Sequence, residues 1–331
     1  MKSLCKLPVE IAGLGSYLPE RVLTNKDLER MVETSDDWIT QRTGIRERRI
    51  AAADQATSDM SIAAARIALE QANVGARDVD TIIVCTCTPD YSFPATACLV
   101  QAAIGAENAF CYDMEAACSG FLFGTVQGAS LIASGISRNV LVIGAETLSR
   151  ITDYQDRRTC ILFGDGAGAA VLTRSRNGGE IIFCELGADG SRPDIVLLPA
   201  GGSRLPPSHA TVDERQHYMK LQGQEVFKWA VSKLGELVDR IPQETGVSFN
   251  EIKLIIPHQS NERIIRSVCE RAGLPPEKAH INIDRVGNTS AASIPIAMHE
   301  AARDDEIQRG DLVLLLTFGS GITWGSMLLR Y

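Results

Sequence analysis

The sequence contains no long uninterrupted hydrophobic run. Its longest apolar stretches, such as residues 312–318, are much shorter than the roughly 20 residues that a membrane-spanning helix needs. Pro8 and Glu10 interrupt the N-terminal segment, which therefore resembles neither a secretory signal nor an obvious transit peptide. These absences predict a cytoplasmic protein that has no membrane as a partner.

Positive charge is also scarce. The chain has 33 lysine and arginine residues against 41 aspartate and glutamate residues, which gives a formal net charge of −8 at pH 7. A molecule of this charge has no general attraction to nucleic acid or to an anionic membrane surface, so neither is expected as a partner. Any basic patch must be local.

Paired cysteines are absent. The nine cysteines include no C-x-x-C pair, which argues against a disulfide framework and fits a reducing compartment. Cys85 and Cys87 share one face of a predicted strand, but no histidine or second cysteine pair stands near them in the sequence. We expect these two side chains to pack in the core and to hold no metal.

The glycine-rich segments lack the third glycine of a dinucleotide fingerprint. Gly164, Gly166 and Gly168 precede a strand pattern, whereas the fingerprint G-x-G-x-x-G must enter a helix. Gly13 and Gly15 have no third partner either. We interpret both segments as close packing or tight turns, and no metal or redox cofactor is expected.

What the sequence does contain is a regular alternation of strand and helix patterns. A chain of 331 residues with 45% hydrophobic residues is long enough for about two domains. Buried-strand patterns are found at residues 81–87, 109–114, 140–145, 181–186, 253–257, 311–318 and 322–329, and helix patterns at 59–72, 95–104, 223–238 and 290–302. Two similar halves in sequence, residues 1–175 and 176–331, indicate a duplicated α/β architecture.

Cys118 stands at the corner between a predicted strand and a predicted helix, within residues 113–135. A thiol at the first turn of a helix faces unpaired N–H groups and the positive end of the helix dipole, which favour the nucleophilic thiolate. The alternative is a buried cysteine that serves as a small hydrophobic residue. The segment alone leaves both interpretations open.

Two polar residues occupy similar corners in the second half. His258 follows a strand pattern, and Asn288 precedes a helix pattern. Taken singly, a structural histidine and a turn asparagine are the ordinary interpretations. Together with Cys118, the set is one that nucleophilic acyl transfer uses, although sequence spacing does not show that the three residues meet.

Residues 41–49 hold four arginines, and Trp38 lies just before them. Arginine clusters are usually solvated loops, but the forked donors of arginine also suit phosphate groups. This segment is therefore either a charged surface loop or an anion site beside an aromatic ring.

Seven segments together resemble the β-ketoacyl-acyl carrier protein synthase III family of condensing enzymes, in the thiolase superfamily. The resemblance runs from about residue 8 to the C-terminus. The matching segments are GLGSYLPE (13–20), TSDDWITQRTGIRERR (34–49), AACSGF (116–121), FGDGAGAAVL (163–172), IIPHQSNERI (255–264), RVGNTSAASIP (285–295) and FGSGITWGS (318–326). The resemblance implies a duplicated thiolase-like α/β fold with five layers, αβαβα, in a homodimer.

The resemblance also implies a reaction: decarboxylative condensation of an acyl-coenzyme A primer with malonyl-acyl carrier protein, which initiates fatty-acid synthesis. Cys118 would carry the acyl group, and His258 and Asn288 would serve the malonyl substrate. Backbone N–H groups of Cys118 and Ser320 would stabilise the oxyanion. Coenzyme A enters as a thioester substrate, so no cofactor is implied.

The binding residues follow from the same resemblance. Trp38 and Arg157 would hold the adenine of coenzyme A between them, and Arg42 would lie near its phosphates. Phe93 would line the acyl pocket across the dimer interface, and Gln224 would line the pantetheine tunnel. The segment assigned to carrier-protein docking is Gln259, Ser260, Asn261, Glu262 and Arg263.

Three departures from the family pattern leave the primer in question. Ser320 stands where the family commonly has glycine, Gln224 where we expect asparagine, and Glu115 near Cys118 where we expect a small apolar residue. Glu115 would raise the thiol pKa if it pointed inward, and would have little effect if it faced solvent. The alternatives are another Cys-His condensing enzyme of the superfamily, of the polyketide or coenzyme A-only type, and a non-catalytic acyl-coenzyme A-binding module.

Overall fold

Two five-stranded sheets form the framework of the computed structural model, which describes residues 4–176 and 178–331. The first sheet has the order β2 (Val9–Tyr17), β8 (Asp165–Arg174), β7 (Asn139–Thr147), β5 (Thr81–Cys85) and β6 (Phe110–Met114). The second has the order β1 (Leu4–Leu7), β9 (Glu180–Ala188), β14 (Thr323–Arg330), β13 (Leu312–Gly319) and β12 (Leu254–Pro257).

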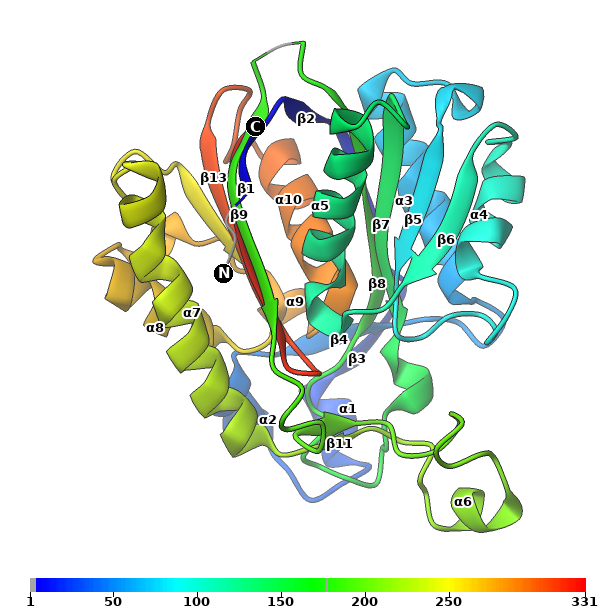
Figure 1. Ribbon diagram of the computed structural model, residues 1–331. Helices are drawn as coiled ribbons and strands as arrows, with labels where there is room; N and C mark the ends of the chain where they lie inside the picture. The colour runs from blue at the N-terminus through cyan, green and yellow to red at the C-terminus, as the bar shows by residue number, and fades with distance from the viewer. Residues whose placement is uncertain (1–3, 177) are drawn as a thin grey trace.

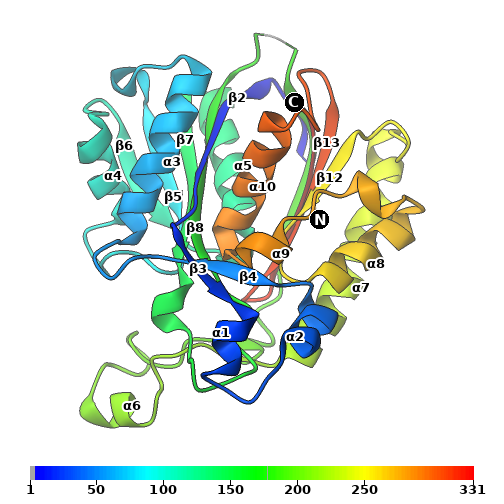
Figure 2. The same cartoon turned by 180° about the vertical axis from the view of Figure 1, so that it is seen from behind.

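Helices fill the space between the sheets and cover both outer faces (Figure 1). The central layer is made of α5 (Gly120–Ala133) and α10 (Ser293–Arg303). The outer layers are α3 (Thr57–Ala72) with α4 (Thr96–Ile104) on the first sheet and α7 (Gly223–Thr245) with α8 (Glu262–Ala272) on the second (Figure 2). This arrangement is the predicted five-layered αβαβα fold.

Shorter elements connect these layers. They are β3 (Arg21–Thr24), α1 (Asn25–Glu29), α2 (Asp36–Thr43), β4 (Glu47–Ile50), η1 (Ala76–Asp78), η2 (Ala117–Ser119), η3 (Leu148–Ile151), β10 (Val196–Leu197), α6 (His209–Asp213), β11 (Lys220–Leu221), η4 (Pro276–Lys278), α9 (Ile283–Val286) and η5 (Ser290–Ala292). No helix in the described part of the chain is both long enough and apolar enough to span a bilayer.

The parallel strands bring their carboxyl ends together at one edge of each sheet. β5 runs parallel to both β6 and β7, and β12 runs parallel to β13. In parallel neighbours the carboxyl ends lie at the same sheet edge, where ligands bind in open α/β sheets. Cys118 follows β6 and His258 follows β12, so each lies at such an edge.

Close packing explains the glycine-rich segment on β8. A Cβ atom added at Gly168 would lie 2.7 Å from the backbone nitrogen of Ile296 in α10, and one at Gly164 would lie 2.3 Å from the Val286 carbonyl oxygen. Only a residue without a side chain allows α10 to approach this strand so closely. The interpretation of these glycines as packing positions is confirmed.

Three details of the predicted elements differ in the structure. The strand predicted to reach Cys87 ends at Cys85, because the chain turns at Thr86 to bind the carboxylate of Glu146. The helix predicted to end at residue 238 continues to Thr245. Strand β4, within the arginine-rich segment, was not predicted, and it pairs with β3.

Replacing Gly168 with alanine tests the packing of α10 on β8. The added methyl group overlaps backbone atoms that have little freedom to move, so Gly168→Ala should destabilise the fold by about 1–3 kcal/mol. Urea or thermal unfolding measures the change. Gly190→Ala is the matched control, because nothing lies within 4 Å of its added Cβ atom, and equal stability of both variants would contradict the close-packing interpretation.

Candidate active site

The end of β13 holds the turn that carries Cys118. This residue lies in the short helix η2, between β6 and α5. Thr317 Oγ1 of β13 donates a hydrogen bond to the Cys118 carbonyl oxygen at 2.9 Å. A Cβ atom added at Gly319 would lie 2.9 Å from the Cys118 backbone nitrogen, so β13 contacts the turn itself.

The same strand supports His258. The backbone N–H of His258 donates to the carbonyl oxygen of Leu316 at 2.7 Å, one residue before Thr317. The next residue, Gln259, donates its backbone N–H to Ser293 Oγ at the start of α10. Cys118 and His258 are thus fastened to neighbouring positions of one strand.

Asn288 reaches this region through Ser290. Its carbonyl Oδ1 accepts a hydrogen bond from the Ser290 backbone N–H at 2.9 Å. Ser290 lies on η5, which packs against η2, the short helix that holds Cys118. Because the carbonyl end of the Asn288 amide is already engaged, its NH₂ end is the part that can donate to a bound oxygen atom.

The surroundings of Cys118 favour the thiol rather than the thiolate. Burial raises the pKa of Cys118 to about 12, and the negative charges of Glu146 and Glu115 add to this effect. The Ser290 hydroxyl and the backbone N–H of Cys118 oppose the shift without cancelling it. Burial and the N–H groups at the helix terminus therefore act in opposite directions on the pKa of Cys118, and burial is the larger of the two effects.

Glu115 is exposed and does not point toward the thiol. Its carboxylate accepts a hydrogen bond from the backbone N–H of Ala117 at 2.9 Å, so it closes the turn before Cys118. Its charge still contributes to the raised pKa of Cys118. The effect that we expected only for an inward carboxylate is present, as a smaller contribution.

His258 is buried and neutral. Burial lowers its pKa to about 3, and its Nδ1 atom has no hydrogen-bond partner among the described residues. A neutral imidazole can donate one hydrogen bond, but at this pKa it is a weak proton acceptor. This histidine is suited to donating to a substrate oxygen.

The turn that follows β13 carries Ser320. Its hydroxyl donates to the Val196 carbonyl oxygen at 2.8 Å, so the side chain turns away from the Cys118 region toward β10. The side chain that departs from the family pattern therefore binds another loop, and the backbone of the turn remains beside η2 through Thr323, which donates to the Ala116 carbonyl oxygen.

The side chains of two arginines lie over the ring of Trp38. The Arg42 guanidinium is 4.8 Å and the Arg157 guanidinium 5.5 Å from the ring centroid. Both arginines are exposed, and Arg157 also donates to the Glu33 carbonyl oxygen at 3.1 Å. The three residues named for the nucleotide form one cluster at the surface.

The arginines of residues 41–49 divide into two groups. Arg42 and Arg46 are exposed, whereas Arg48 is fully buried and donates to Asn25 Oδ1 and to the carbonyl oxygens of Leu23 and Ile161. Burial lowers the pKa of Arg48 to about 10. The segment is thus partly a structural core and partly a surface, which neither initial interpretation anticipated.

The predicted docking segment, residues 259–263, is not a continuous surface. Gln259 is fully buried, and its amide donates to the carbonyl oxygens of Pro257 and His280. It therefore offers no surface to a carrier protein, and its physical role is to hold the loop of His258. Of the five residues only Arg263 is exposed; Ser260, Asn261 and Glu262 are half-buried.

Phe93 and Gln224 lie at the surface of the single chain. Phe93 is 85% exposed, although burial of a phenylalanine side chain is normally favourable. Gln224 is exposed in the first turn of α7. The structure does not bring either residue into contact with Cys118.

Cys85 and Cys87 behave as predicted in part. Cys85 is fully buried, whereas Cys87 lines a pocket of about 470 Å³ and donates its thiol to Glu146 Oε1 at 3.1 Å. Within residues 4–176 and 178–331, no group of three or more cysteine, histidine or acidic side chains is arranged to hold a metal ion.

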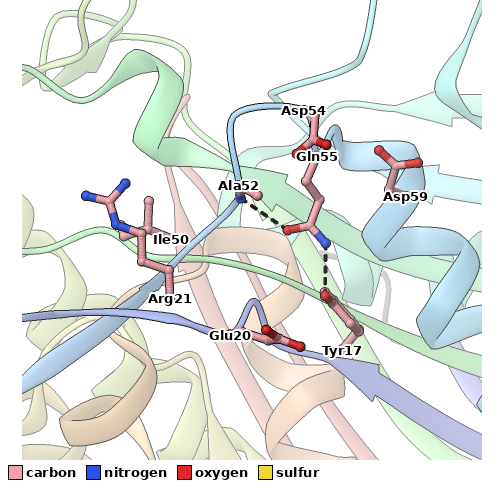
Figure 3. Close-up of a pocket in the computed structure, with 8 residues that line it drawn as sticks. All are labelled: Tyr17, Glu20, Arg21, Ile50, Ala52, Asp54, Gln55 and Asp59. Carbon is pink, nitrogen blue, oxygen red and sulfur yellow. Dashed lines mark hydrogen bonds between the residues drawn. The ribbon is translucent and has the colours of Figure 1, made fainter.

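A larger surface pocket, of about 630 Å³, contains none of the predicted site residues (Figure 3). Polar groups of this pocket form hydrogen bonds with one another. The Gln55 side chain donates to the Tyr17 hydroxyl at 2.9 Å and accepts from the backbone N–H of Ala52. The size of a pocket therefore does not locate the chemistry in this chain.

Sequence reasoning missed Glu146 and Ser290. Glu146 lies in β7, just beyond the run of hydrophobic residues that was predicted as a strand, and it is fully buried. A lone acidic residue at the end of an apolar strand pattern is the signal that would have found it, because buried charges are rare without a function or a partner.

Comparisons with known proteins decide the family. The model described as 3-Oxoacyl-[acyl-carrier-protein (ACP)] synthase III matches residues 112–190, and the model of its C-terminal part matches residues 243–331. The beta-ketoacyl-[acyl-carrier-protein] synthase III of Caldanaerobacter subterraneus subsp. tengcongensis is 50% identical over 326 residues, 98% of either chain. The chain belongs to the β-ketoacyl-[acyl-carrier-protein] synthase III family.

Solved structures agree with this assignment. The synthase III of Aquifex aeolicus VF5 is 46% identical, with a TM-score of 0.90 over 98% of this chain and 100% of that one. The priming beta-ketosynthase of the R1128 polyketide biosynthetic pathway is 32% identical, with a TM-score of 0.89 over 97% of this chain and 96% of that one. The chain therefore shares its fold with a polyketide enzyme as well.

The protonation state of His258 can be tested directly. Since burial lowers its pKa to about 3, the ring should stay neutral throughout the range from about pH 5 to pH 8, where an ordinary histidine gains a proton. NMR of protein labelled at its histidine rings measures this, and loss of one signal in His258→Ala assigns it.

His280 is the internal control for that titration. Burial opposes its charged form, but hydrogen bonds with Glu300 and Glu306 outweigh this effect and raise its pKa. Its ring should therefore titrate above the ordinary histidine range. A His258 signal that titrates together with that of His280 would contradict the neutral assignment.

Proposed function

We propose that Cys118, His258 and Asn288 together catalyse the reaction of the family in this chain. The reaction is decarboxylative condensation of an acyl-coenzyme A with malonyl-acyl carrier protein, which gives a 3-oxoacyl-acyl carrier protein and initiates fatty-acid synthesis. The protein is thus an acyltransferase. The observation that carries the assignment of residues is their common support: β13 holds Cys118 and His258, and η5, whose Ser290 binds Asn288, packs against the η2 turn of Cys118.

In the first half-reaction, Cys118 takes the acyl group. Its sulfur attacks the thioester carbonyl carbon, and coenzyme A leaves as a thiol. Negative charge develops on the carbonyl oxygen, and backbone N–H groups of Cys118 and Ser320 would stabilise it without having to reorganise. The close approach of Gly319 to the Cys118 nitrogen supports the placement of both donors on one side of the thiol.

In the second half-reaction, the malonyl thioester loses CO₂ and its thioester oxygen becomes an enolate oxygen. The neutral His258 ring and the Asn288 amide supply two donors for this oxygen. The enolate carbon then attacks the acyl-Cys118 carbonyl carbon, and the Cys118 sulfur leaves. A neutral His258 ring suits this role, because it can donate a hydrogen bond without carrying a charge.

Coenzyme A would enter beside Trp38. The indole ring and the Arg157 guanidinium would hold the adenine between them, and Arg42 would lie near the phosphates. Their observed contact supports this placement, since all three residues already share one surface cluster. Gln224, exposed in the first turn of α7, would border the pantetheine path.

The carrier protein would dock on α8 near Arg263. This side chain is exposed and lies with its guanidinium 5.1 Å from the Phe227 ring centroid. Ser260, Asn261 and Glu262 would lie at the edge of this surface, and Gln259 is excluded because it is buried. Local positive charge is required here, since the molecule as a whole carries a net charge of −8.

A homodimer would cover an open edge of the first sheet. β6 is an edge strand and has no neighbour on its outer side within the described residues. Phe93 and Tyr91, 85% and 60% exposed, extend from the loop that precedes α4. An unpaired strand edge beside exposed aromatic rings is a surface that a second copy would bury. Phe93 would then reach the partner's acyl pocket.

The proposed reaction also implies which cofactors, partners and compartment are involved. Coenzyme A serves as a substrate, and the two half-reactions need no metal or redox cofactor. Neither nucleic acid nor a membrane takes part, and the pathway is cytoplasmic.

A role in priming polyketide synthesis is the second candidate. The likeness to the R1128 priming ketosynthase favours it, and in either role this chain would use Cys118, His258 and Asn288 in the same way. The two candidates differ in the primer. Turnover of a panel of acyl-coenzyme A primers with malonyl-acyl carrier protein separates them, because preference for acetyl or short branched primers supports the fatty-acid role.

Separate measurement of the two half-reactions tests the division of labour. His258→Ala and Asn288→Ala should still form the acyl adduct on Cys118 from acetyl-coenzyme A. Each should lose decarboxylation by about 100- to 1,000-fold, the typical cost of removing an oxyanion donor. Mass spectrometry follows the adduct, and trapping of released CO₂ follows decarboxylation.

The double variant and Cys118→Ala complete that experiment. If the two donors act as a unit, the loss in the double variant should be smaller than the sum of the single losses in free energy. Cys118→Ala should form no adduct at all. If acylation in His258→Ala falls as far as condensation, His258 acts on the thiol and the division proposed above is wrong.

Replacing Phe93 tests the dimer. Phe93→Glu places a charge in the proposed interface and should convert the protein largely to monomer, as measured by sedimentation equilibrium. Met31→Glu is the matched control, because Met31 is also an exposed apolar residue but follows α1, an element that lies away from β6 (Figure 2). A wild-type protein that sediments as a monomer would refute the proposed interface.

A further inference from the structure

A single buried carboxylate binds three residues of the segment that leads to Asn288. Glu300 lies on α10 and is 3% exposed. Its Oε2 atom accepts hydrogen bonds from Asn282 Nδ2 at 2.7 Å and from Arg285 Nη2 at 3.1 Å, and it lies 3.4 Å from His280 Nε2. The reaction steps described above give this carboxylate no role.

Asn282 is the residue through which Glu300 reaches both donors of the second half-reaction. It is fully buried, and its backbone N–H donates to Gln259 Oε1 at 3.0 Å. Its backbone carbonyl oxygen accepts from two N–H groups of α9, at 3.0 and 3.1 Å. Asn282 is therefore bonded in one direction to the neighbour of His258 and in the other to the helix that precedes Asn288.

The connection toward His258 runs through Gln259. The Gln259 amide donates to the carbonyl oxygens of Pro257 and His280 at 2.9 and 3.0 Å, and its oxygen accepts from Asn282. The residues on either side of His258 are thus tied to residues 280–282. Because His258 Nδ1 has no hydrogen-bond partner among the described residues, the position of its backbone largely determines where the ring lies.

The connection toward Asn288 runs through α9. This helix ends at Gly287, whose φ angle is +69°, and Asn288 follows directly. Arg285 of α9 donates to both carboxylate oxygens of Glu300, at 3.1 and 3.4 Å, so the carboxylate holds α9 against α10 (Figure 2). A shift of Glu300 would therefore move the backbone from which Asn288 extends.

The geometry around His280 requires a charged ring. The residue is 6% exposed, and both ring nitrogens face carboxylates: Nδ1 lies 2.8 Å from Glu306 Oε2, and Nε2 lies 3.4 Å from Glu300 Oε2. A neutral imidazole has one N–H and a carboxylate only accepts, so the ring donates to both partners only when it carries two protons. Burial opposes this charge, but the two hydrogen bonds outweigh burial and raise the pKa of His280.

The other charged groups around His280 favour the same state. Three carboxylates interact with the ring, namely Glu300, Glu306 and Asp304. Two arginines bind these carboxylates, Arg285 at Glu300 and Arg303 at Asp304. On the side of α8, the buried Cys269 packs with the two residues that flank His280, and burial raises the pKa of its thiol, which stays neutral. Loss of the His280 proton would leave this cluster with an excess of negative charge.

We propose that Glu300 and the protonated His280 position His258 and Asn288 together for the second half-reaction. This inference rests on the roles of His258 and Asn288 proposed above. Glu300 and His280 act through Asn282 and its neighbours and touch no reacting atom, so they are positioning residues. They place the two donors at the distance from each other that one enolate oxygen needs.

Acylation of Cys118 should be independent of this cluster. The turn of Cys118 is held from the strand side, where Thr317 donates to the Cys118 carbonyl oxygen at 2.9 Å and Thr323 to the Ala116 carbonyl oxygen at 3.1 Å. Neither contact involves α9 or α10. A change in the cluster should therefore appear in the second half-reaction and leave the first at its wild-type rate.

Glu300→Gln tests this selectivity, because it keeps the size of the side chain and removes its charge. Release of CO₂ from malonyl-acyl carrier protein should fall by about 10- to 100-fold, since a misplacement of about 1 Å costs on the order of 100-fold in rate. Single-turnover acylation of Cys118 by acetyl-coenzyme A, followed by mass spectrometry, should stay close to the wild-type rate. Equal losses in both half-reactions would mean that Glu300 serves stability alone, which would overturn the proposal.

Glu185→Gln is the matched control. Glu185 on β9 is another buried carboxylate that binds an arginine, Arg240 of α7, at 2.5 Å. Its replacement removes a buried charge from the second sheet without touching α9 or α10. The ratio of CO₂ release to acylation should therefore be unchanged in Glu185→Gln and reduced in Glu300→Gln.

Two variants of His280 distinguish the contacts of its two nitrogens. In His280→Gln the amide nitrogen takes the place of Nε2 and can donate to Glu300, whereas in His280→Asn it takes the place of Nδ1 and can donate to Glu306. His280→Gln should keep most of the CO₂ release at pH 7. His280→Asn should lose about 10-fold or more, the effect of losing a hydrogen bond to a charged group. The opposite order would contradict the central place of Glu300.

The pH profile supplies a third test. Since the pKa of His280 is raised, the charged ring persists through neutral pH and is lost as the pH rises through that pKa. The ratio of CO₂ release to acylation should fall over the same range, with the midpoint of the His280 ring signal in NMR. His280→Gln should lack this fall, because its amide does not titrate. An equal fall in this variant would exclude His280 as its source.

These outcomes are distinct from failure of the proposed function. If the wild type forms no acyl adduct or releases no CO₂ from malonyl-acyl carrier protein, the proposed function fails. If it does both, and Glu300→Gln and His280→Asn release CO₂ as fast as the wild type, the positioning role is wrong and the proposed function stands. Should Glu300→Gln fail to fold, the two His280 variants and the pH profile decide.

Discussion

The contact between the end of β13 and the turn of Cys118 is the constraint on which the rest of the site depends. Three residues of this strand are involved: the Leu316 carbonyl oxygen accepts from the His258 N–H, Thr317 donates to the Cys118 carbonyl oxygen, and Gly319 leaves room for the Cys118 nitrogen. The nucleophile follows a strand of the first sheet and the histidine a strand of the second. Their relative position is therefore fixed by one strand rather than by the packing of two separate halves.

Burial decides which polar residues of the sequence motifs do chemistry and which hold the structure. Gln259 and Arg48 stand in motifs that look functional, yet both are fully buried and donate to backbone carbonyl oxygens. Such groups are costly to leave unpaired, so their partners fix the local backbone tightly. Gln259 thereby positions the loop of His258, and Arg48 ties β4 to the chain near Ile161.

The fold could be predicted from the sequence where hydrophobic patterns mark the helices and strands. The alternation of apolar strands and amphipathic helices indicated two α/β halves, and the close packing of Gly168 could be expected from its place in a strand pattern. Convergence of Cys118, His258 and Asn288 could not, because sequence spacing carries no information on long-range contacts. The family resemblance supplied their roles.

Two features of the site were beyond sequence reasoning for a physical reason. The thiol pKa of Cys118 depends on the balance between desolvation and the helix terminus, and only the three-dimensional surroundings show that desolvation is larger. Glu146 lies 28 positions after Cys118 in the sequence, and η5, which packs against the elements of both, comes from the second half of the chain. Neither the sign of the shift nor the connection follows from local pattern.

The cluster at Trp38 has a consequence for how a ligand is recognised there. Two guanidinium groups already lie over the indole ring, so a flat aromatic ligand replaces an existing contact instead of filling an empty one. The affinity measured at such a site is a difference between two stacking energies, and it understates the strength of the bound contact. A displaced arginine keeps its charge and becomes available to the anionic part of the same ligand. One side chain thus exchanges an aromatic partner for an ionic one, which favours molecules that carry both groups over those that carry only one.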